Sequence, residues 1–129
     1  VSNKWCKASG SPVVVNCDQK GPAPYVGSTT SSYTGGQIAG YGGGDSKCNV
    51  IFSGSRMCTV TDFTIYGAPS AFGWYSTFST TDDVGGIYET RGDCRGWTSS
   101  DGASRGAVWA SNQPSTHNCD EAYKIICCR

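Results

Sequence analysis

Four carboxylate side chains fall between Trp74 and Cys94, and together they could bind a hard cation: Asp82, Asp83, Glu89 and Asp93. Calcium needs several oxygen ligands that converge at about 2.3 to 2.6 Å, and a long loop of this composition can supply them. Acidic clusters of this size also occur commonly on loop surfaces, where they are simply solvated. The sequence therefore allows one calcium site here, with solvation of the loop as the commoner role.

Tryptophan rings suggest a second kind of site. Sugars stack their C–H faces on flat aromatic surfaces, while nearby amides and carboxylates accept hydroxyl protons. The predicted ligand-binding residues, all from the stretch that follows Trp97, are Trp109, Asn112, Gln113 and Asp101. Tryptophans in a small domain more often form its core, and we expect this of Trp74 and Trp97.

Residues for catalysis are sparse. His117 is the only histidine, it lies in a Ser/Thr-rich stretch, and no Gly-x-Ser-x-Gly motif accompanies it. A lone histidine in such a setting is usually a solvated one. We therefore expect a protein that binds a ligand and is not an enzyme.

The cysteines indicate the compartment. Eight cysteines in 129 residues form no Cys-x-x-Cys pair, so a zinc cluster is disfavoured and disulfides are expected. We expect all eight to be paired, without a free thiol, in a secreted or extracellular protein. The chain begins at Val1 without a charged and hydrophobic leader, which is typical of a mature protein whose signal peptide has been removed.

Charge and hydropathy exclude two classes of partner. Ten Lys and Arg residues balance ten Asp and Glu residues, and neither sign forms a block that could follow a phosphate backbone. Nucleic acid is therefore not an expected partner. No apolar run approaches the roughly 20 residues of a membrane span, so none is predicted.

The elements that must position these residues are short. The length favours a single domain over 1–129, and 18 glycines with many Ser and Thr residues favour short strands and structured loops. Residues 5–18 predict a strand pair closed by a Cys6–Cys17 disulfide, and residues 20–34 a surface loop or flexible connector. Two short helices follow, one over 46–52 capped by Asp45 and one that opens at Thr59 and ends at Gly67. Later strands are expected at 72–75, 86–88, 107–110 and 122–126. This order, with helices early and strands late, predicts an α+β domain.

The spacing of the cysteines in the back half resembles that of the C-type lectin-like superfamily. The similarity is greatest to cysteine-rich secreted bacterial domains of that fold, which are distantly similar to endostatin. The segments that carry the resemblance, in order, are 43–48, 54–59, 73–74, 93–99 and 127–128. The resemblance covers 35–129 as a lectin-like core and leaves 1–34 as an N-terminal hairpin and loop. It implies two short helices, a small mixed or antiparallel sheet and long disulfide-stapled loops.

The resemblance also implies a disulfide pattern. Cys94 pairs with Cys119, and Cys48 and Cys58 pair with the adjacent residues Cys127 and Cys128. Neighbours on a strand point to opposite faces, so these last two cysteines should reach different partners. The family pattern favours Cys48 with Cys127, although a slip of one residue would exchange the two partners.

For function, the resemblance implies lectin-like binding of a glycan, or of a cell-surface or extracellular protein, through the loops between Trp74 and Gln113. The calcium-binding motifs of the family, Glu-Pro-Asn or Gln-Pro-Asp and then Trp-Asn-Asp, are missing, so its calcium ligands are not carried across. A second hypothesis is a non-catalytic structural or self-assembling module. Its near-zero net charge would permit copies to associate as a homo-oligomer. A third, an ice- or mineral-binding surface, is disfavoured because regular Thr-x-Thr arrays are missing.

Overall fold

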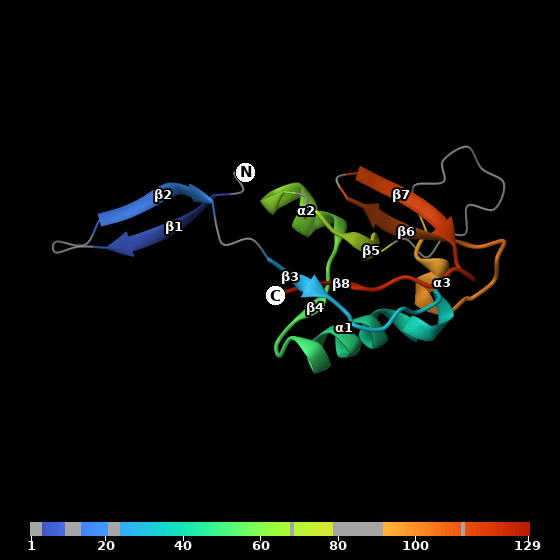
Figure 1. The fold of residues 1–129 in the computed structure, drawn as a ribbon. Coiled ribbons are helices and arrows are strands. Elements are labelled where there is room, and N and C mark those ends of the chain that lie inside the picture. Colours follow the sequence, from blue (N-terminus) through green and yellow to red (C-terminus); the bar gives the residue numbers. More distant parts are fainter. Residues whose placement is uncertain (1–3, 10–13, 21–23, 68, 79–91, 112) are drawn as a thin grey trace.

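The protein is an α+β domain in which small antiparallel sheets are held to short helices by disulfides (Figure 1). The computed structural model describes residues 24–67, 69–78, 92–111 and 113–129, and the backbone of 4–9 and 14–20. No helix in this described part of the chain has the length and apolar character needed to cross a bilayer.

The first two strands form the predicted hairpin. Strand β1 (Lys4–Ser9) pairs antiparallel with β2 (Val14–Lys20), and the ladder shifts register between Trp5 and Lys7. Cys6 lies at this shift, between Trp5 and Lys7, whose partners Gln19 and Asn16 lie on either side of Cys17 and Asp18. Figure 1 shows the hairpin extending away from the rest of the chain. The Cys6–Cys17 disulfide itself concerns side chains outside the described part, so it stays a prediction.

Strand β8 (Ile126–Cys128) is the central strand of a three-stranded sheet. It pairs antiparallel with β3 (Tyr25–Ser28) on one edge and with β4 (Arg56–Met57) on the other. A second sheet has the order β5 (Phe72–Trp74), β6 (Arg105–Ala110), β7 (Gln113–Asn118), again antiparallel. A parallel bridge between Trp74 and Ile125 joins the two sheets.

Alternation along the last strand divides the core into two clusters. Ile125 and Cys127 belong to one cluster, which also contains Trp74 and Trp97, while Ile126 and Cys128 belong to the other. Trp74 and Trp97 are both 0% exposed, which confirms their predicted place in the core. Side chains that point alternately to opposite faces explain how one short strand serves both clusters.

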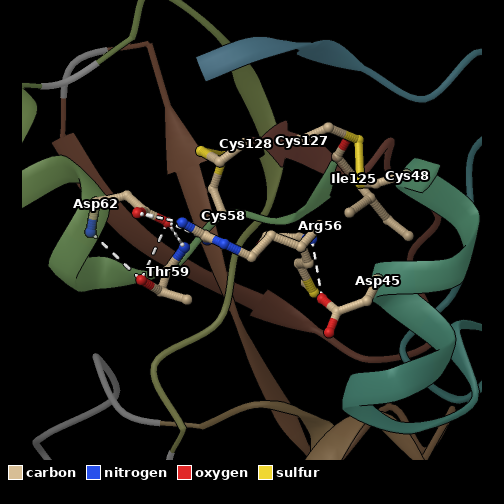
Figure 2. The surroundings of a disulfide bond; sticks show 10 residues. Asp45, Cys48, Arg56, Cys58, Thr59, Asp62, Ile125, Cys127 and Cys128 are labelled. Carbon is tan, nitrogen blue, oxygen red and sulfur yellow. Dashed lines mark hydrogen bonds and ion pairs between the residues drawn. A yellow bond between two sulfur atoms is a disulfide. The ribbon is translucent and has the colours of Figure 1, made fainter. Parts of the chain in front are cut away.

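Three disulfides confirm the expected pattern. Cys48 bonds Cys127, Cys58 bonds Cys128 and Cys94 bonds Cys119, and all six residues are fully buried. Figure 2 shows Cys127 and Cys128 reaching their partners on different sides of the strand. No cysteine side chain in the described part of the molecule is free.

Helix α1 (Gly40–Ile51) is longer than predicted. The expected start at Ser46, with Asp45 as the N-cap, is wrong, because Asp45 lies inside the helix and its carboxylate accepts the Met57 N–H at 3.1 Å. Glycine disfavours helix, so the run before Asp45 was not expected to be helical. Packing overrides this preference: a Cβ on Gly44 would come within 2.8 Å of the Met57 sulfur, so only glycine permits this approach to β4.

Helix α2 (Val60–Tyr66) follows its sequence signals. Thr59 is the N-cap, its hydroxyl accepts the Asp62 N–H at 3.3 Å, and the Asp62 carboxylate accepts the Thr59 N–H at 2.8 Å. This reciprocal capping box and the C-cap at Gly67 confirm the predicted second helix.

The predicted strands had mixed outcomes. Those at 72–75 and 107–110 are confirmed as β5 and β6, and the one at 86–88 lies outside the described residues. The strand predicted at 122–126 is wrong in position, because Tyr123 and Ile125 form only isolated bridges before β8 begins.

Three strands were missed: β3, β4 and β7. The loop expected over 20–34 contains β3, whose partner on β8 lies about a hundred positions away and leaves no local signal. Residues 113–118 are polar and include Pro114, which is tolerated because β7 is an edge strand.

A left-handed turn precedes β6. Cys94, Arg95, Gly96 and Trp97 have φ values of 49°, 55°, 73° and 62° and form the short helical segment α3 (Cys94–Trp97). Such values cost roughly 1 to 2 kcal/mol for each non-glycine residue. Burial of Trp97 and the Cys94–Cys119 disulfide provide the constraint that maintains this conformation.

Candidate functional site

Trp109 lies in the core and does not form a surface platform. The residue is 7% exposed, its ring lies 4.6 Å from the Phe63 ring and 5.7 Å from the Tyr75 ring, and its Nε1 donates to the Pro69 carbonyl at 3.0 Å. The ring therefore offers no open face for a sugar, contrary to its predicted ligand-binding role. Trp109 lies on strand β6 and belongs to one buried cluster with Phe63 and Tyr75, which accounts for its burial.

The remaining predicted ligand-binding residues do not form a set with Trp109. Gln113 is exposed and pairs with Ala110, so it shares a sheet face with Ala110 and points away from the face of Trp109. Asp101 is exposed, and its carboxylate accepts the Ala103 N–H at 2.9 Å within its own turn. Asn112 lies outside the described residues.

Asp93, one of the four predicted calcium ligands, is 0% exposed and fully engaged by protein donors. Its carboxylate accepts the Tyr41 hydroxyl at 2.8 Å, the Thr77 hydroxyl at 2.9 Å, the Thr77 N–H at 3.0 Å and the Ser76 hydroxyl at 3.3 Å. Burial is the main cause that raises the pKa of Asp93 above its usual value, against the effect of these hydrogen bonds. Asp93 therefore anchors Thr77 and Tyr41 within the structure. The other three carboxylates lie outside the described residues, so calcium binding there stays a prediction.

A second carboxylate is buried beside a disulfide. Cys58, Asp62 and Cys128 place potential metal-ligand atoms within 4.8 Å of one another. The two sulfurs are joined to each other, and Asp62 accepts two hydrogen bonds from Arg56 at 2.6 and 2.8 Å (Figure 2). Burial opposes ionisation of Asp62, but Arg56 and Thr59 outweigh it and hold its pKa below the usual value. The potential ligand atoms of these three residues are therefore already bonded within the protein, and the group has a structural role.

One group of partly exposed side chains combines aromatic rings with a carboxylate and could contact a ligand. We call it the Tyr123 cluster and define it as Phe72, His117, Glu121 and Tyr123. The Tyr123 ring lies 5.3 Å from the Phe72 ring and 5.0 Å from the His117 ring. Phe72 is 45% exposed, and the side chains of Glu121 and His117 are 41% and 29% exposed. An aromatic surface and a carboxylate thus meet at the outside of the molecule.

Tyr123 is held rigidly at the centre of the cluster. Its backbone exchanges two hydrogen bonds with Tyr33, at 2.8 and 3.0 Å, and its ring stands edge-on to Trp74 at 5.1 Å. Trp74 in turn donates from Nε1 to the Tyr33 carbonyl at 2.7 Å. The exposed cluster therefore rests on the buried core.

Glu121 is oriented by three neighbours. Its Oε1 accepts the Tyr123 hydroxyl at 2.7 Å, its Oε2 accepts the Asn118 N–H at 2.8 Å, and His117 Nδ1 lies 3.5 Å from Oε1. The hydrogen bond from Tyr123 is the chief cause that lowers the pKa of Glu121. Burial and the same bond raise the pKa of Tyr123 to about 12. At neutral pH, Glu121 is therefore a carboxylate and Tyr123 a neutral phenol.

The hydrogen bonds also assign the histidine tautomer. Tyr123 has one hydroxyl proton, which it donates to Glu121, so the 2.8 Å contact with His117 requires Nδ1 to donate. In a neutral imidazole, Nε2 is then an acceptor. Among the described residues, Nε2 has no hydrogen-bond partner. The cluster can therefore offer a ligand an aromatic surface and hydrogen-bond acceptors.

Sequence reasoning missed this cluster. Its sequence predicts a solvated histidine at His117 and ordinary strand residues at Phe72 and Tyr123. The available signal was the spacing His117, Glu121, Tyr123, which places an acid and a phenol near the only histidine. The contribution of Phe72, 45 positions before His117 in the sequence, has no local signal at all.

No family model matches the chain, and no curated protein or solved structure shows significant similarity to it.

Proposed function

We propose that this chain is an extracellular, non-catalytic recognition domain of C-type lectin-like fold that binds a glycan at the Tyr123 cluster. The observation that carries the proposal is the exposed Phe72 ring packed against Tyr123, whose hydroxyl donates to Glu121, a carboxylate already oriented by the protein. Sugars are bound by stacking on aromatic rings and by hydrogen bonds to fixed polar groups. Preorganisation of Glu121 reduces the entropy that binding must otherwise cost.

Two features support the lectin-like and extracellular parts of the proposal. Cys48 of α1 bonds the final strand at Cys127, and Cys94 bonds Cys119, which is the pairing that the family resemblance implies. Three disulfides suit an oxidising compartment, where such bonds form and persist.

The site differs from the one expected on sequence grounds. The predicted binding loops lie between Trp74 and Gln113, whereas every member of the Tyr123 cluster lies outside that range. A glycan bound at the cluster needs no metal ion, because the Glu121 carboxylate provides an acceptor directly. Binding at the acidic loop would instead require calcium.

A glycan array with the wild-type protein, in calcium and again in chelator, tests the proposal. We expect binding in both conditions and a loss of tenfold or more in Phe72→Ala and in Glu121→Gln. Phe78→Ala and Asp120→Asn are matched controls, since Phe78 is 63% exposed and Asp120 is an exposed neighbour of Glu121. Binding that disappears in chelator would move the site to the acidic loop, and no binding in either condition would reject the glycan function.

A self-assembling module is the competing function. Val50 and Phe78 are 84% and 63% exposed, and the formal net charge is zero, so copies would not repel one another. Sedimentation at micromolar concentration distinguishes the two. A monomer that binds glycans supports recognition, whereas an oligomer that binds none supports assembly.

A further inference from the structure

We infer that the glycan recognised at the Tyr123 cluster carries a protonated amine, so that the ligand is an amino sugar. This inference rests on the proposed glycan function and specifies the chemistry of the ligand. It follows from which hydrogen-bonding groups of the cluster are already occupied and which remain for a ligand.

The donors of the cluster are already used within the protein. The Tyr123 hydroxyl donates to Glu121, the Asn118 N–H donates to Glu121, and His117 Nδ1 donates to Tyr123. Each carboxylate oxygen has two lone pairs, so Glu121 keeps acceptor capacity beyond these bonds. A ligand must therefore approach with donors, and an anionic sugar would place its acceptors against acceptors.

Charge favours an ammonium group over a hydroxyl group as that donor. The lowered pKa of Glu121 keeps its carboxylate ionised at neutral pH. Hydrogen bonds between two ionised groups are shorter and roughly twice as strong as neutral ones.

The aromatic part of the cluster favours the same ligand. The centroid of the Phe72 ring lies 6.0 Å from that of His117 and 5.3 Å from that of Tyr123, and the Phe72 ring, 45% exposed, is the open aromatic face of the cluster. The C–H face of a sugar ring can lie on it, and aromatic faces also attract cations. An amino sugar satisfies both requirements with one molecule.

The test is a calorimetric titration of the full chain with three oligosaccharides of equal length. These are a glucosamine oligomer with free amines, its fully N-acetylated counterpart, and a uronic acid oligomer. We expect the free amine to bind about tenfold more tightly than the acetylated form, as a charge-assisted bond replaces a neutral one. In Glu121→Gln this preference should fall to about twofold or less, while Asp120→Asn should keep most of it.

Each outcome bears on the inference separately from the proposed function. Equal binding of the amine and acetylated forms, or tightest binding of the uronic acid oligomer, would overturn the amine requirement and leave glycan recognition standing. A trilysine peptide that binds as well as the glucosamine oligomer would show that the sugar ring contributes nothing, which overturns the assignment to an amino sugar. Failure of all three sugars to bind would overturn the amino-sugar inference, while the glycan array decides separately whether the glycan function stands.

Discussion

Two hydrogen bonds from a tyrosine hydroxyl to a carboxylate, one in the core and one at the surface, have different consequences in this molecule. Tyr41 donates its hydroxyl to Asp93 at 2.8 Å, and Tyr123 donates its hydroxyl to Glu121 at 2.7 Å. Asp93 is 0% exposed, whereas the Glu121 side chain is 41% exposed. The pKa of Asp93 is raised, chiefly by burial, and that of Glu121 is lowered, chiefly by its tyrosine. The same chemical pair is thus a structural anchor when buried, and when exposed it leaves a carboxylate accessible to solvent.

A third carboxylate, that of Asp62, shows how a neighbouring cation changes the pKa of a buried acid. Asp62 is only 6% exposed, yet its pKa lies below the usual value because Arg56 and Thr59 compensate its burial. All the donors to Asp93 are neutral hydroxyl or amide groups. Burial therefore decides the sign of the shift only where no cation is in contact.

The largest expected effect is on the buried anchor. Asp93→Ala should lower the free energy of unfolding by about 3 to 5 kcal/mol, because each buried donor left without an acceptor costs about 1 to 3 kcal/mol. Glu121→Ala should cost under about 1 kcal/mol, as is usual for an exposed residue. Urea unfolding of both variants measures the difference. Asp93→Asn, which keeps one acceptor oxygen, should give an intermediate loss, and similar losses for Asp93→Ala and Glu121→Ala would contradict the comparison.

The two tyrosine hydroxyls provide a more conservative pair of changes. Tyr41→Phe should cost about 1 to 2 kcal/mol, since it removes one hydrogen bond from a buried carboxylate. Tyr123→Phe should cost about 0.5 kcal/mol or less, but it should raise the pKa of Glu121 toward its ordinary value. Chemical denaturation measures the first effect and an NMR titration of the Glu121 carboxyl carbon the second. An unchanged Glu121 titration would show that Tyr123 does not orient this carboxylate.

The smallest effect is the pH dependence, which should have opposite signs at the two buried aspartates. The lowered pKa of Asp62 means that its contribution to stability is present above the unfolded pKa of about 3.9 and is lost as pH falls through the folded value. The raised pKa of Asp93 means that its contribution is present below about pH 3.9 and is lost as pH rises through the folded value.

Stability measured between pH 2 and pH 6 for the wild-type protein and two variants separates these contributions. Asp62→Asn should remove part of the loss of stability in acid, and Asp93→Asn should remove part of the loss that accompanies rising pH. Identical pH profiles for both variants would contradict the assignment of opposite shifts.

Local signals were enough to predict several elements correctly. Thr59 and Asp62 are three residues apart and form their capping box without help from the remainder of the chain, so α2 was predictable. The alternation of side chains along a strand was enough to expect Cys127 and Cys128 to bond different partners. Which cysteine each would reach came only from the family resemblance.

Elements that depend on distant partners were not predictable in the same way. The glycine run at the start of α1 disfavours a helix, and only the approach of β4 to Gly44 and the Cys48–Cys127 bond make one favourable. Strand β3 has few apolar residues and exists because β8 offers it hydrogen bonds. Trp109 was predicted to bind a ligand with Asn112 and Gln113, and the packing of Phe63 of α2 against it on β6 buries it.

The sequence by itself determined the caps of α2, the hairpin and the choice of an oxidised, disulfide-held domain, since each depends on residue types and short spacings. Only the tertiary structure decided that Asp93 is an anchor and Glu121 a surface acceptor. Both are acidic residues close to a loop cysteine, and nothing in their local sequence distinguishes them. Burial raises the pKa of Asp93, whereas the hydrogen bond from Tyr123 lowers that of the exposed Glu121, and which of the two is buried depends on packing by residues far away in the chain.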